Sequence, residues 1–257
     1  EADVRGSYGG RGSAKTRTFA KMTAVRAYMW DMEGREGIIL CARQFMNSLA
    51  DSSLEEVKAA IQSEAWLEPY FEIGEKFVRT RSGHISYSFS GLDRNIRSIK
   101  SKARILLGWV DEAEPVTDVA WSTLIPTLRE EDSELWVTWN PERKSSATNM
   151  RFRGNGDPLV KIVEMNYRDN PWFPEILERA RLRDFSQRPD QYAHIWDGDY
   201  ITAVEGAYYA RQLAEAKADK RLACRINPDP LMTIRAVWDI GGTGLKADAT
   251  AIWVCQF

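Results

Sequence analysis

The sequence has few cysteines, few histidines and no excess of charge of either sign. Three cysteines, Cys41, Cys224 and Cys255, lie far apart among the 257 residues and form no Cys-x-x-Cys pair. This usage excludes a disulfide framework and fits a reducing compartment. Lysine plus arginine number 35 against 37 acidic residues, which gives a formal net charge of -2. Such a balance argues against a wholly basic nucleic-acid coat but allows a local basic patch.

Long apolar runs are also missing. None approaches the roughly 20 residues that a membrane-spanning helix needs, so we expect no membrane partner. The two histidines, His84 and His194, have no partners at metal-ligand spacing, and we interpret both as structural. The rest of the composition, 44% apolar and 28% charged, is typical of a globular chain.

A glycine-rich segment near the N-terminus is the strongest signal present. It reads Gly9-Gly10-Arg11-Gly12-Ser13-Ala14-Lys15-Thr16. An expected short strand, Val4 to Tyr8, precedes it, and apolar residues at helical spacing follow it: Phe19, Met22, Val25 and Met29. A strand, a glycine turn and a helix that opens with Lys-Thr form the context of a phosphate-binding loop.

The residues of this loop have distinct expected roles. The usual pattern is Gly-x-x-x-x-Gly-Lys-Ser/Thr, in which Gly9 holds the first position and Ala14 replaces the second glycine. We expect the loop amides to wrap phosphates, Lys15 to neutralise β/γ oxygens and Thr16 to ligate Mg²⁺. We also expect Lys15 to be exposed when no nucleotide is bound. A glycine-rich turn with an accidental Lys-Thr is the ordinary alternative.

A pair of adjacent carboxylates, Asp111 and Glu112, ends the apolar run that begins at Ile105. We expect Asp111 to hold Mg²⁺ through water and Glu112 to polarise an attacking water. A solvated acidic turn after a strand is the common alternative, since Glu114 is acidic too. Because the pair follows a phosphate loop in the same chain, the two motifs together predict nucleotide hydrolysis.

Weaker signals lie elsewhere in the chain. The strand that ends at Trp139 carries Thr138 and is followed by Asn140, and both side chains are candidates to reach the γ-phosphate region. Strand-Asn-Pro is, however, an ordinary turn signal. A basic stretch either contacts DNA phosphate, offers an arginine to a neighbouring subunit's nucleotide, or is a solvated face; it comprises Arg94, Arg97, Lys100, Lys102 and Arg104.

Apolar strand-like runs alternate with helical patterns along the chain. Further strands are expected at Ile38 to Ala42, Ile105 to Asp111, Glu134 to Trp139 and Val160 to Asn166. An antiparallel hairpin is expected within Glu72 to Ser90, with its turn at Ser82-Gly83. Helices are expected at Asp51 to Trp66 (with Asp51 or Ser52 as N-cap), Thr117 to Arg129, Pro174 to Phe185 and Pro189 to Trp196. This order predicts an α/β fold with a mostly parallel sheet and helices on both faces.

The C-terminal part has a different organisation. Asn227-Pro228-Asp229-Pro230 is the clearest linker signal, and two strands follow it at Ile234 to Ile240 and Thr250 to Val254. Two strands do not stabilise a domain alone. We therefore expect three parts: an ATPase domain at 1–200, a helical or linker part at 201–230, and the start of a further domain at 231–257.

The combined motifs resemble the large terminase subunit of tailed bacteriophages, the DNA-packaging motor. Beyond the loop, the resemblance rests on Cys41-Ala42-Arg43, Trp109 to Glu114, Thr138 to Pro141, Asn166 to Pro171 and His194 to Gly198. It implies a P-loop ATPase of the additional-strand catalytic glutamate class, which uses ATP and Mg²⁺ to move double-stranded DNA, followed by an RNase H-like nuclease. It also implies self-association into a ring, portal protein and small terminase subunit as partners, and action in the cytoplasm of an infected bacterial host.

The resemblance implies roles for individual residues as well. Arg11 matches an arginine four residues before the lysine that stabilises the γ-phosphate, a role worth about 10³ to 10⁵ in rate. Lys15, Thr16, Asp111 and Glu112 match the phosphate, metal and catalytic groups, and Thr138 to Asn140 match the segment that couples hydrolysis to movement. Asp239 matches the first metal-binding aspartate of the nuclease, and Asp248 follows near the second strand; with only one or two of the carboxylates of a two-metal site present, we expect nuclease activity only in the full-length protein.

Other functions compete with a packaging motor. A P-loop phosphotransferase such as a small kinase would place its acceptor base elsewhere than Glu112, and a helicase-like ATPase would carry a late arginine motif that we do not find. A nucleotide-gated scaffold without turnover is a further possibility, and it predicts that Glu112→Gln leaves phosphate release unchanged.

Overall fold

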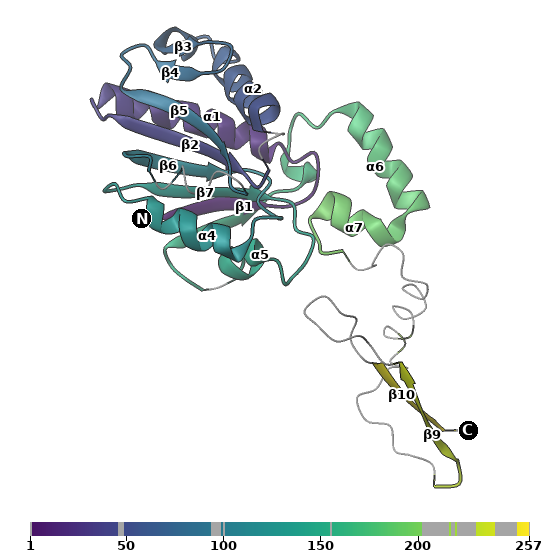
Figure 1. The fold of residues 1–257 in the computed structure, drawn as a ribbon. Coiled ribbons are helices and arrows are strands. Elements are labelled where there is room, and N and C mark those ends of the chain that lie inside the picture. The colour runs from purple at the N-terminus through teal and green to yellow at the C-terminus, as the bar shows by residue number, and fades with distance from the viewer. Residues whose placement is uncertain are drawn as a thin grey trace. The chain divides into compact units, whose positions relative to one another are not determined.

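The structure is a computed structural model that describes residues 2–45, 49–93, 99, 101–154, 156–201, 216, 219, 230–239 and 251–256. The chain divides into two units, Glu1–Val204 and Glu205–Phe257. The described elements of the first unit (Figure 1) are β1 (Val4–Tyr8), α1 (Lys15–Met32), β2 (Gly37–Arg43), α2 (Leu49–Gln62), the 3-10 turn η2 (Glu68–Tyr70), β3 (Phe71–Ile73), β4 (Val78–Thr80), β5 (Ile85–Gly91), β6 (Ile105–Val110), α4 (Asp118–Leu124), η3 (Ile125–Thr127), β7 (Glu134–Trp139), α5 (Ala147–Phe152), β8 (Val160–Glu164), η4 (Tyr167–Asp169), α6 (Glu175–Gln187) and α7 (Pro189–Asp197).

The strands of the first unit form one eight-stranded sheet in the order β3-β4-β5-β2-β6-β7-β1-β8. From β5 to β8 all neighbours are parallel, and only β3 and β4 run antiparallel at one edge. The predicted mostly parallel sheet and the predicted hairpin at Ser82-Gly83 are therefore confirmed. Since parallel strands end at the same edge, the segments that follow β1, β2, β6 and β7 are brought together there.

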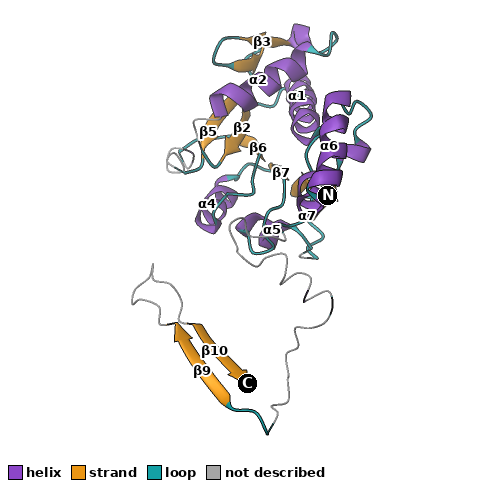
Figure 2. Ribbon diagram, turned by 90° about the vertical axis from the view of Figure 1, so that its right-hand side faces the viewer, coloured by secondary structure: helices purple, strands orange, loops and turns teal. Residues whose placement is uncertain are grey.

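Helices cover both faces of this sheet, as Figure 2 shows. One face packs against α1 and α2 in a core that includes Trp30, Val57 and Ile61. The opposite face packs against α4 and α5 in a core that includes Trp121 and Phe152. All residues of β6 and β7 are buried, which explains why both read as continuous apolar runs.

Helix α1 buries a different face from the one that the apolar spacing of Phe19, Met22, Val25 and Met29 predicts. Met22 and Met29 are partly exposed, at 38% and 42%. The buried stripe consists mainly of small residues: Phe19, Ala20, Thr23, Ala24, Ala27 and Trp30. Alanine side chains let the helix lie close to the sheet, so the methionines are left at the outer surface.

Helices α2 and α4 have boundaries that differ from those expected, and both end earlier than predicted. Helix α2 begins at Leu49, so Asp51 and Ser52 lie inside it and the predicted N-cap is wrong; Leu49 and Ala50 are good helix formers that extend the helix backwards. Helix α4 is capped by Thr117, whose side chain accepts from the Ala120 amide. It ends before Pro126, which has no amide to donate, and continues only as η3.

The second unit contains a two-stranded antiparallel sheet, β9 (Ile234–Asp239) and β10 (Ala251–Gln256). Both predicted strands are present, and Asp239 lies opposite Ala251 in the register. The predicted linker at 201–230 falls almost entirely outside the described residues. The assignment of these parts to domains remains a prediction.

Candidate active site

The loop between β1 and α1 is held in place by close backbone approaches. A Cβ on Gly9 would lie 1.9 Å from the Met165 carbonyl oxygen, and one on Gly10 would lie 2.1 Å from that of Trp196. No side chain fits at either position, so these two glycines are required. Gly12 and Ala14 adopt positive φ angles of 75° and 61°. The loop therefore turns tightly between the segment after β8 and helix α7.

Not all of the loop amides are available to a ligand, contrary to our expectation. The Gly10 amide donates to Asn166 Oδ1 at 2.7 Å, and the Arg11 amide donates to the Ile195 carbonyl at 2.7 Å. Protein acceptors thus satisfy both. In the described part of the chain, no protein acceptor is recorded for the amides from Gly12 to Thr16. These amides lie at the N-terminus of α1, where an anion is favoured.

Lys15 is buried, which makes the expected exposure wrong. Its Nζ donates to the Gly9 and Gly10 carbonyls and to Ser13 Oγ, each at 2.9 Å. The ammonium group therefore finds three hydrogen-bond acceptors within its own loop. Burial lowers the pKa of Lys15 to about 8, and the Asp111 carboxylate opposes that shift.

Hydrogen bonds join the loop to the ends of β6 and β7. Asp111 Oδ1 accepts from Thr16 Oγ1 at 3.1 Å and from Thr138 Oγ1 at 2.7 Å. Thr138 in turn accepts from the Trp109 indole at 3.1 Å. Residues that lie 95 positions apart in the sequence are thus in direct contact. Thr138 is fully buried and positions Asp111, whereas Asn140 is exposed at the rim.

Arg43 at the end of β2 pairs with both acidic residues. Its Nη2 lies 2.5 Å from Asp111 Oδ2, and its Nη1 lies 3.3 Å from Glu112 Oε1. The side chains of Arg43 and Asp111 are only 6% and 3% exposed, so one guanidinium neutralises a buried carboxylate and also orients its neighbour. The sequence points to Arg43 only as part of the Cys41-Ala42-Arg43 motif and does not predict its pairing with Asp111 and Glu112. Its position at a strand end next to the Asp-Glu strand was the available signal.

The backbone at Glu112 is strained because its neighbours bond to different strands. The Asp111 amide donates to the Ala42 carbonyl on β2, and the Ala113 amide donates to the Thr138 carbonyl on β7. Glu112 between them has a φ of 50°, a conformation that costs about 1–3 kcal/mol for such residues. Its side chain is 66% exposed. The left-handed turn at Glu112 leaves its exposed carboxylate next to the buried Asp111.

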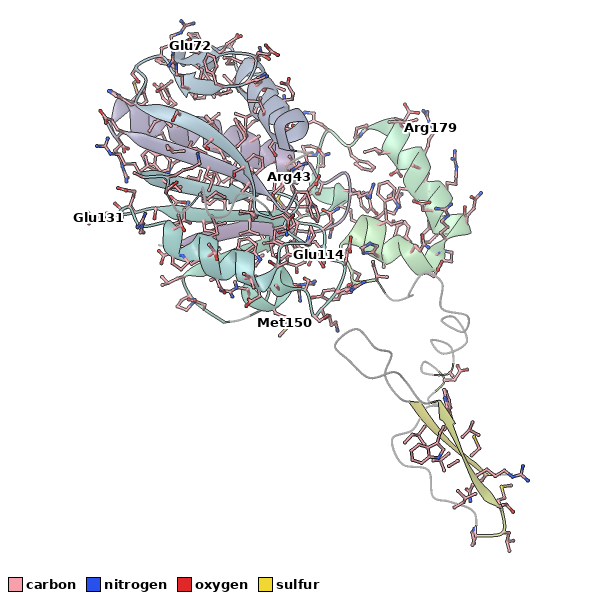
Figure 3. The ribbon with its side chains drawn as sticks, in the orientation of Figure 1. Arg43, Glu72, Glu114, Glu131, Met150 and Arg179 are labelled. Atoms are coloured by element: carbon pink, nitrogen blue, oxygen red, sulfur yellow. The ribbon has the colours of Figure 1, made fainter. Side chains whose placement is uncertain are left out.

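A cavity of about 700 Å³ unites these groups. Its lining includes loop residues 10–17, Asp111, Glu112, Thr138 and Asn140. Arg11 lines it with an exposed side chain for which no partner is found among the described residues. Glu114 also lines the cavity, and burial raises its pKa. Hydrogen bonds from the Arg143 and Glu142 amides lower the pKa, but by less than burial raises it. Figure 3 shows Glu114 and Arg43 at one end of the sheet, with Glu131 at the other.

Some predicted residues are not brought to this site or cannot be placed. Asp239 lies at the end of β9 in the second unit, and its side chain is outside the description. Arg94, Arg97 and Lys100 of the basic stretch also fall outside the described residues. Arg104 is described and pairs with Glu36 at 2.5 Å on the surface.

Metal ligands of the His, Cys, Asp and Glu type do not gather in threes among the described residues. The predicted metal ligands, the Asp111 carboxylate and the Thr16 hydroxyl, both line the cavity. Of the helices that the structure describes, none is long and apolar enough to span a bilayer.

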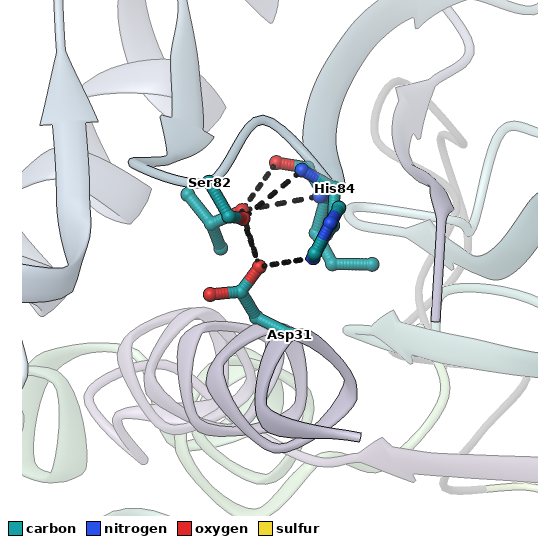
Figure 4. A network of polar contacts seen from close by, with 5 residues as sticks. Asp31, Ser82 and His84 are labelled. Atoms are coloured by element: carbon teal, nitrogen blue, oxygen red, sulfur yellow. Dashed lines mark hydrogen bonds and ion pairs between the residues drawn. The ribbon is translucent and has the colours of Figure 1, made fainter. Parts of the chain in front are cut away.

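A Ser-His-Asp group elsewhere in the fold is structural. Figure 4 shows Asp31 at the end of α1 facing the turn between β4 and β5. Asp31 Oδ1 accepts from the hydroxyls of Thr80 (3.0 Å) and Ser82 and lies 3.3 Å from His84 Nδ1. The serine donates to the aspartate and accepts from the His84 amide. A nucleophilic triad needs the serine on the imidazole, so this group only fixes the hairpin to α1.

Comparison with known proteins gives one family. The profile of the family described as phage terminase large subunit matches residues 2–199. No curated protein sequence matches the chain.

Several solved structures share the fold at low sequence identity. The large terminase of a thermophilic bacteriophage has 12% identity and a TM-score of 0.65, over 79% of this chain and 50% of that one. The complex of the same large terminase with ATP-γ-S has 12% identity and a TM-score of 0.59, over 75% and 46%. The bacteriophage HK97 large terminase has 11% identity and a TM-score of 0.61, over 98% and 59%. A mutant ATPase domain of the Thermus phage P74-26 large terminase has 15% identity and a TM-score of 0.56, over 77% and 89%. This chain spans about half the length of the thermophilic bacteriophage protein.

Proposed function

The chain belongs to the phage terminase large subunit family, whose profile matches residues 2–199, and on that premise we propose that it is the ATPase part of a DNA-packaging motor. In this proposal, ATP hydrolysis drives double-stranded viral DNA into a procapsid. The main observation in support of this proposal is the 3.1 Å hydrogen bond between Thr16 and Asp111, which joins the proposed phosphate loop to the acidic end of β6 at one cavity. The ATP-γ-S complex of the thermophilic bacteriophage protein supports a nucleotide as the ligand.

Phosphate binding uses the groups that the loop leaves available. The amides from Gly12 to Thr16 and the N-terminus of α1 donate to phosphate oxygens. Lys15 exchanges its three contacts with the loop for contacts with the β- and γ-phosphates. Because its burial is unfavourable to the ammonium ion, an anionic ligand relieves a cost that the free protein carries.

The donor set fits Mg²⁺. The Thr16 hydroxyl and the Asp111 carboxylate are hard oxygen ligands, and Mg²⁺ needs few protein ligands because it keeps waters and binds phosphate oxygens. When bound, Mg²⁺ neutralises charge on the β- and γ-phosphates. Thr138 and Arg43 each bond one oxygen of Asp111, so the carboxylate is oriented before any ligand arrives.

Hydrolysis requires activation of a water molecule, and we assign this role to Glu112. Its exposed carboxylate lines the cavity beside Asp111 and can accept a proton from water. Arg43 holds this carboxylate at one oxygen. The exposed Arg11 guanidinium at the cavity offsets charge that develops on the transferred phosphoryl group. Coupling to movement starts at Thr138, which contacts Asp111, and continues into Asn140 at the rim.

The activities of the whole protein are further parts of the proposal. We assign residues 1–200 to the ATPase domain, 201–230 to a linker part and 231–257 to the start of an RNase H-like nuclease that cuts concatemeric DNA. Asp239 is its first metal ligand. A ring of subunits, the portal protein and the small terminase subunit are the proposed partners, and the host cytoplasm is the proposed location. No observation favours a phosphotransferase or a helicase.

The test is ATP hydrolysis measured with and without double-stranded DNA, in the wild type and two variants. Lys15→Ala removes the phosphate contact and Glu112→Gln removes the base, so each lowers the rate about 10²-fold or more. Both variants keep the fold: Lys15 is an unfavourable buried cation, and Glu112 is solvated. Circular dichroism and thermal unfolding check this.

Glu131→Gln is the matched control, because Glu131 is an exposed glutamate at the opposite end of the sheet (Figure 3). It should hydrolyse ATP at the wild-type rate. Unchanged turnover in Lys15→Ala would refute the site, and transfer of phosphate to an acceptor other than water would refute the motor.

A further inference from the structure

A second, mostly apolar cavity lies beside the phosphate loop. It has a volume of about 890 Å³ and lies between the outer face of α1 and the segment that leads into α6. We call it the α1–α6 groove. Its floor includes the partly exposed Met22 and Met29 of α1, and Trp172 and Leu177 lie on the other side. The packing of the small-residue stripe of α1 against the sheet leaves these methionines here.

The groove is continuous with the proposed phosphate cavity. Gly12, Ala14 and Arg17 line both. The Arg17 guanidinium is held by α2, since it donates to the Ala59 carbonyl at 3.0 Å and lies 3.7 Å from Glu56 Oε2. A ligand whose phosphates lie against the amides of the loop can therefore extend past Ala14 into the groove.

Trp172 stands at the loop end of the groove and is unusually exposed, at 83%. Its position is tied to the phosphate loop through Asn170. The Asn170 side chain donates to the Gly12 carbonyl at 2.8 Å and accepts from the Trp172 amide at 3.0 Å. The neighbouring Phe173 packs its ring against Tyr167 and Trp196, but Trp172 has no recorded ring contact within the described residues. A large aromatic face is thus held beside the loop without a partner.

We propose that the loop end of the α1–α6 groove binds the heterocyclic base and ribose of the nucleoside triphosphate, with Trp172 stacking on the base. The inference rests on the proposed function, because the phosphates must occupy the adjacent loop. Asn170 Nδ2 and Oδ1 each already have a partner within the protein. The base is therefore held by stacking and apolar contact.

The test compares a ligand that has a base with one that lacks it. Equilibrium binding of Mg-ATP and of Mg-tripolyphosphate is measured for the wild type, Trp172→Ala, Trp172→Phe and Ile176→Ala. Trp172→Ala should bind ATP about ten-fold more weakly, as expected for loss of one base-aromatic stack, with tripolyphosphate affinity unchanged. Trp172→Phe keeps an aromatic face and should stay within about three-fold of the wild type for both.

Ile176→Ala is the matched control, because Ile176 is 63% exposed near Trp172 and is not part of the groove lining. Its affinities should not change. Equal losses of both ligands in Trp172→Ala, or no loss of ATP affinity, would overturn the inference while the proposed function stands. A wild type that binds neither ligand would instead contradict the proposed function itself.

Discussion

Arg43 is the residue on which the charge balance of the site depends. It neutralises the buried carboxylate of Asp111 and contacts the exposed carboxylate of Glu112 through the two ends of one guanidinium. A planar fork of donors suits this double contact, and a lysine at this position would offer only one point charge. Lys15 is another buried cation of the site, and burial disfavours its charge.

Removal of Arg43 should disable the site and weaken the fold. Arg43→Gln leaves Asp111 as an unpaired buried charge, a change that costs about 3–5 kcal/mol. Urea denaturation should show this loss of unfolding free energy, and ATP hydrolysis should fall with it.

The control is Arg179→Gln, which breaks an exposed pair with Glu175 on α6 (Figure 3). Such surface pairs contribute about 0–1 kcal/mol, so this variant should be as stable and active as the wild type. Similar stability losses in the two variants would contradict the role assigned to Arg43.

Lys15 should make nucleotide binding take up protons near pH 8. Its pKa in the free protein is about 8, lowered by burial, and bound phosphate raises it again by favouring the ammonium ion. At pH 8 about half of the free sites are uncharged, so binding should take up about 0.5 proton per nucleotide. Titration calorimetry in buffers of different ionisation enthalpy measures this number.

The same titration at pH 6.5 provides the control, because Lys15 is then protonated in both states. The pKa of Lys15 also makes the free energy of unfolding depend on pH. Between about pH 8 and 10.5 the unfolded chain, in which Lys15 has the ordinary pKa of 10.5, binds more protons than the folded protein. The unfavourable contribution of Lys15 to folding therefore diminishes as pH rises through that window. Binding enthalpies that are independent of buffer at pH 8 would contradict the assigned pKa.

At the scale of the element, the junction of loop and helix α1 determines the site. Ala14 is the residue before α1, and it adopts the left-handed conformation with φ 61° and ψ 18°. The sequence pattern expects glycine there, and the structure gives the physical reason: the position requires a positive φ, which costs about 1–2 kcal/mol for residues with a Cβ.

Ala14→Gly should relieve this strain. Glycine also raises the conformational entropy of the unfolded chain, which opposes the relief of strain. The unfolding free energy should therefore rise by up to about 1 kcal/mol. Thermal unfolding measures the change, and Ala20→Gly in the interior of α1 is a control that should lose stability. A loss of stability in Ala14→Gly would show that the conformation carries no strain.

Most elements were predictable from local patterns, and the misses have local causes. Strands β6 and β7 are buried on both faces, so their apolar runs are unambiguous. The face of α1 was less predictable, because alanines at the sheet leave Met22 and Met29 outside. The start of α2 was misplaced because a good capping residue, Asp51, follows residues that themselves favour helix. Propensity cannot decide between a cap and a longer helix.

At the scale of the whole molecule, the first unit contains both hydrophobic cores and every described residue of the nucleotide site. In the second unit, the apolar side chains of β9 and β10 are largely exposed, for example Trp238 at 62% and Trp253 at 67%. A two-stranded sheet is at best marginally stable alone. The stability of the first unit should therefore not depend on residues 205–257.

A protein that ends at Val204 tests this independence. It should unfold at the same temperature as the 257-residue chain and bind Mg-ATP with the same affinity, since the described residues of both cores and of the cavity all precede residue 205. Thermal unfolding and titration calorimetry check both quantities. A clear fall in the unfolding temperature would mean that the two units stabilise each other.

The sequence by itself determined the motifs, the succession of strands and helices along the chain and the family resemblance, because a phosphate loop and a buried strand ending in Asp-Glu are local patterns with strict residue requirements. The tertiary structure alone decided which groups meet. Parallel strands bring Arg43, Asp111 and Thr138 to one edge, and only there does Arg43 pair with both carboxylates. The segment after β8 and helix α7 take up the Gly10 and Arg11 amides, and the burial of Lys15 follows from the contacts that it makes with its own loop. The contacts of Arg43 and of the Gly10 and Arg11 amides depend on distances between segments that are remote in the chain, whereas those of Lys15 depend on the conformation of the loop itself.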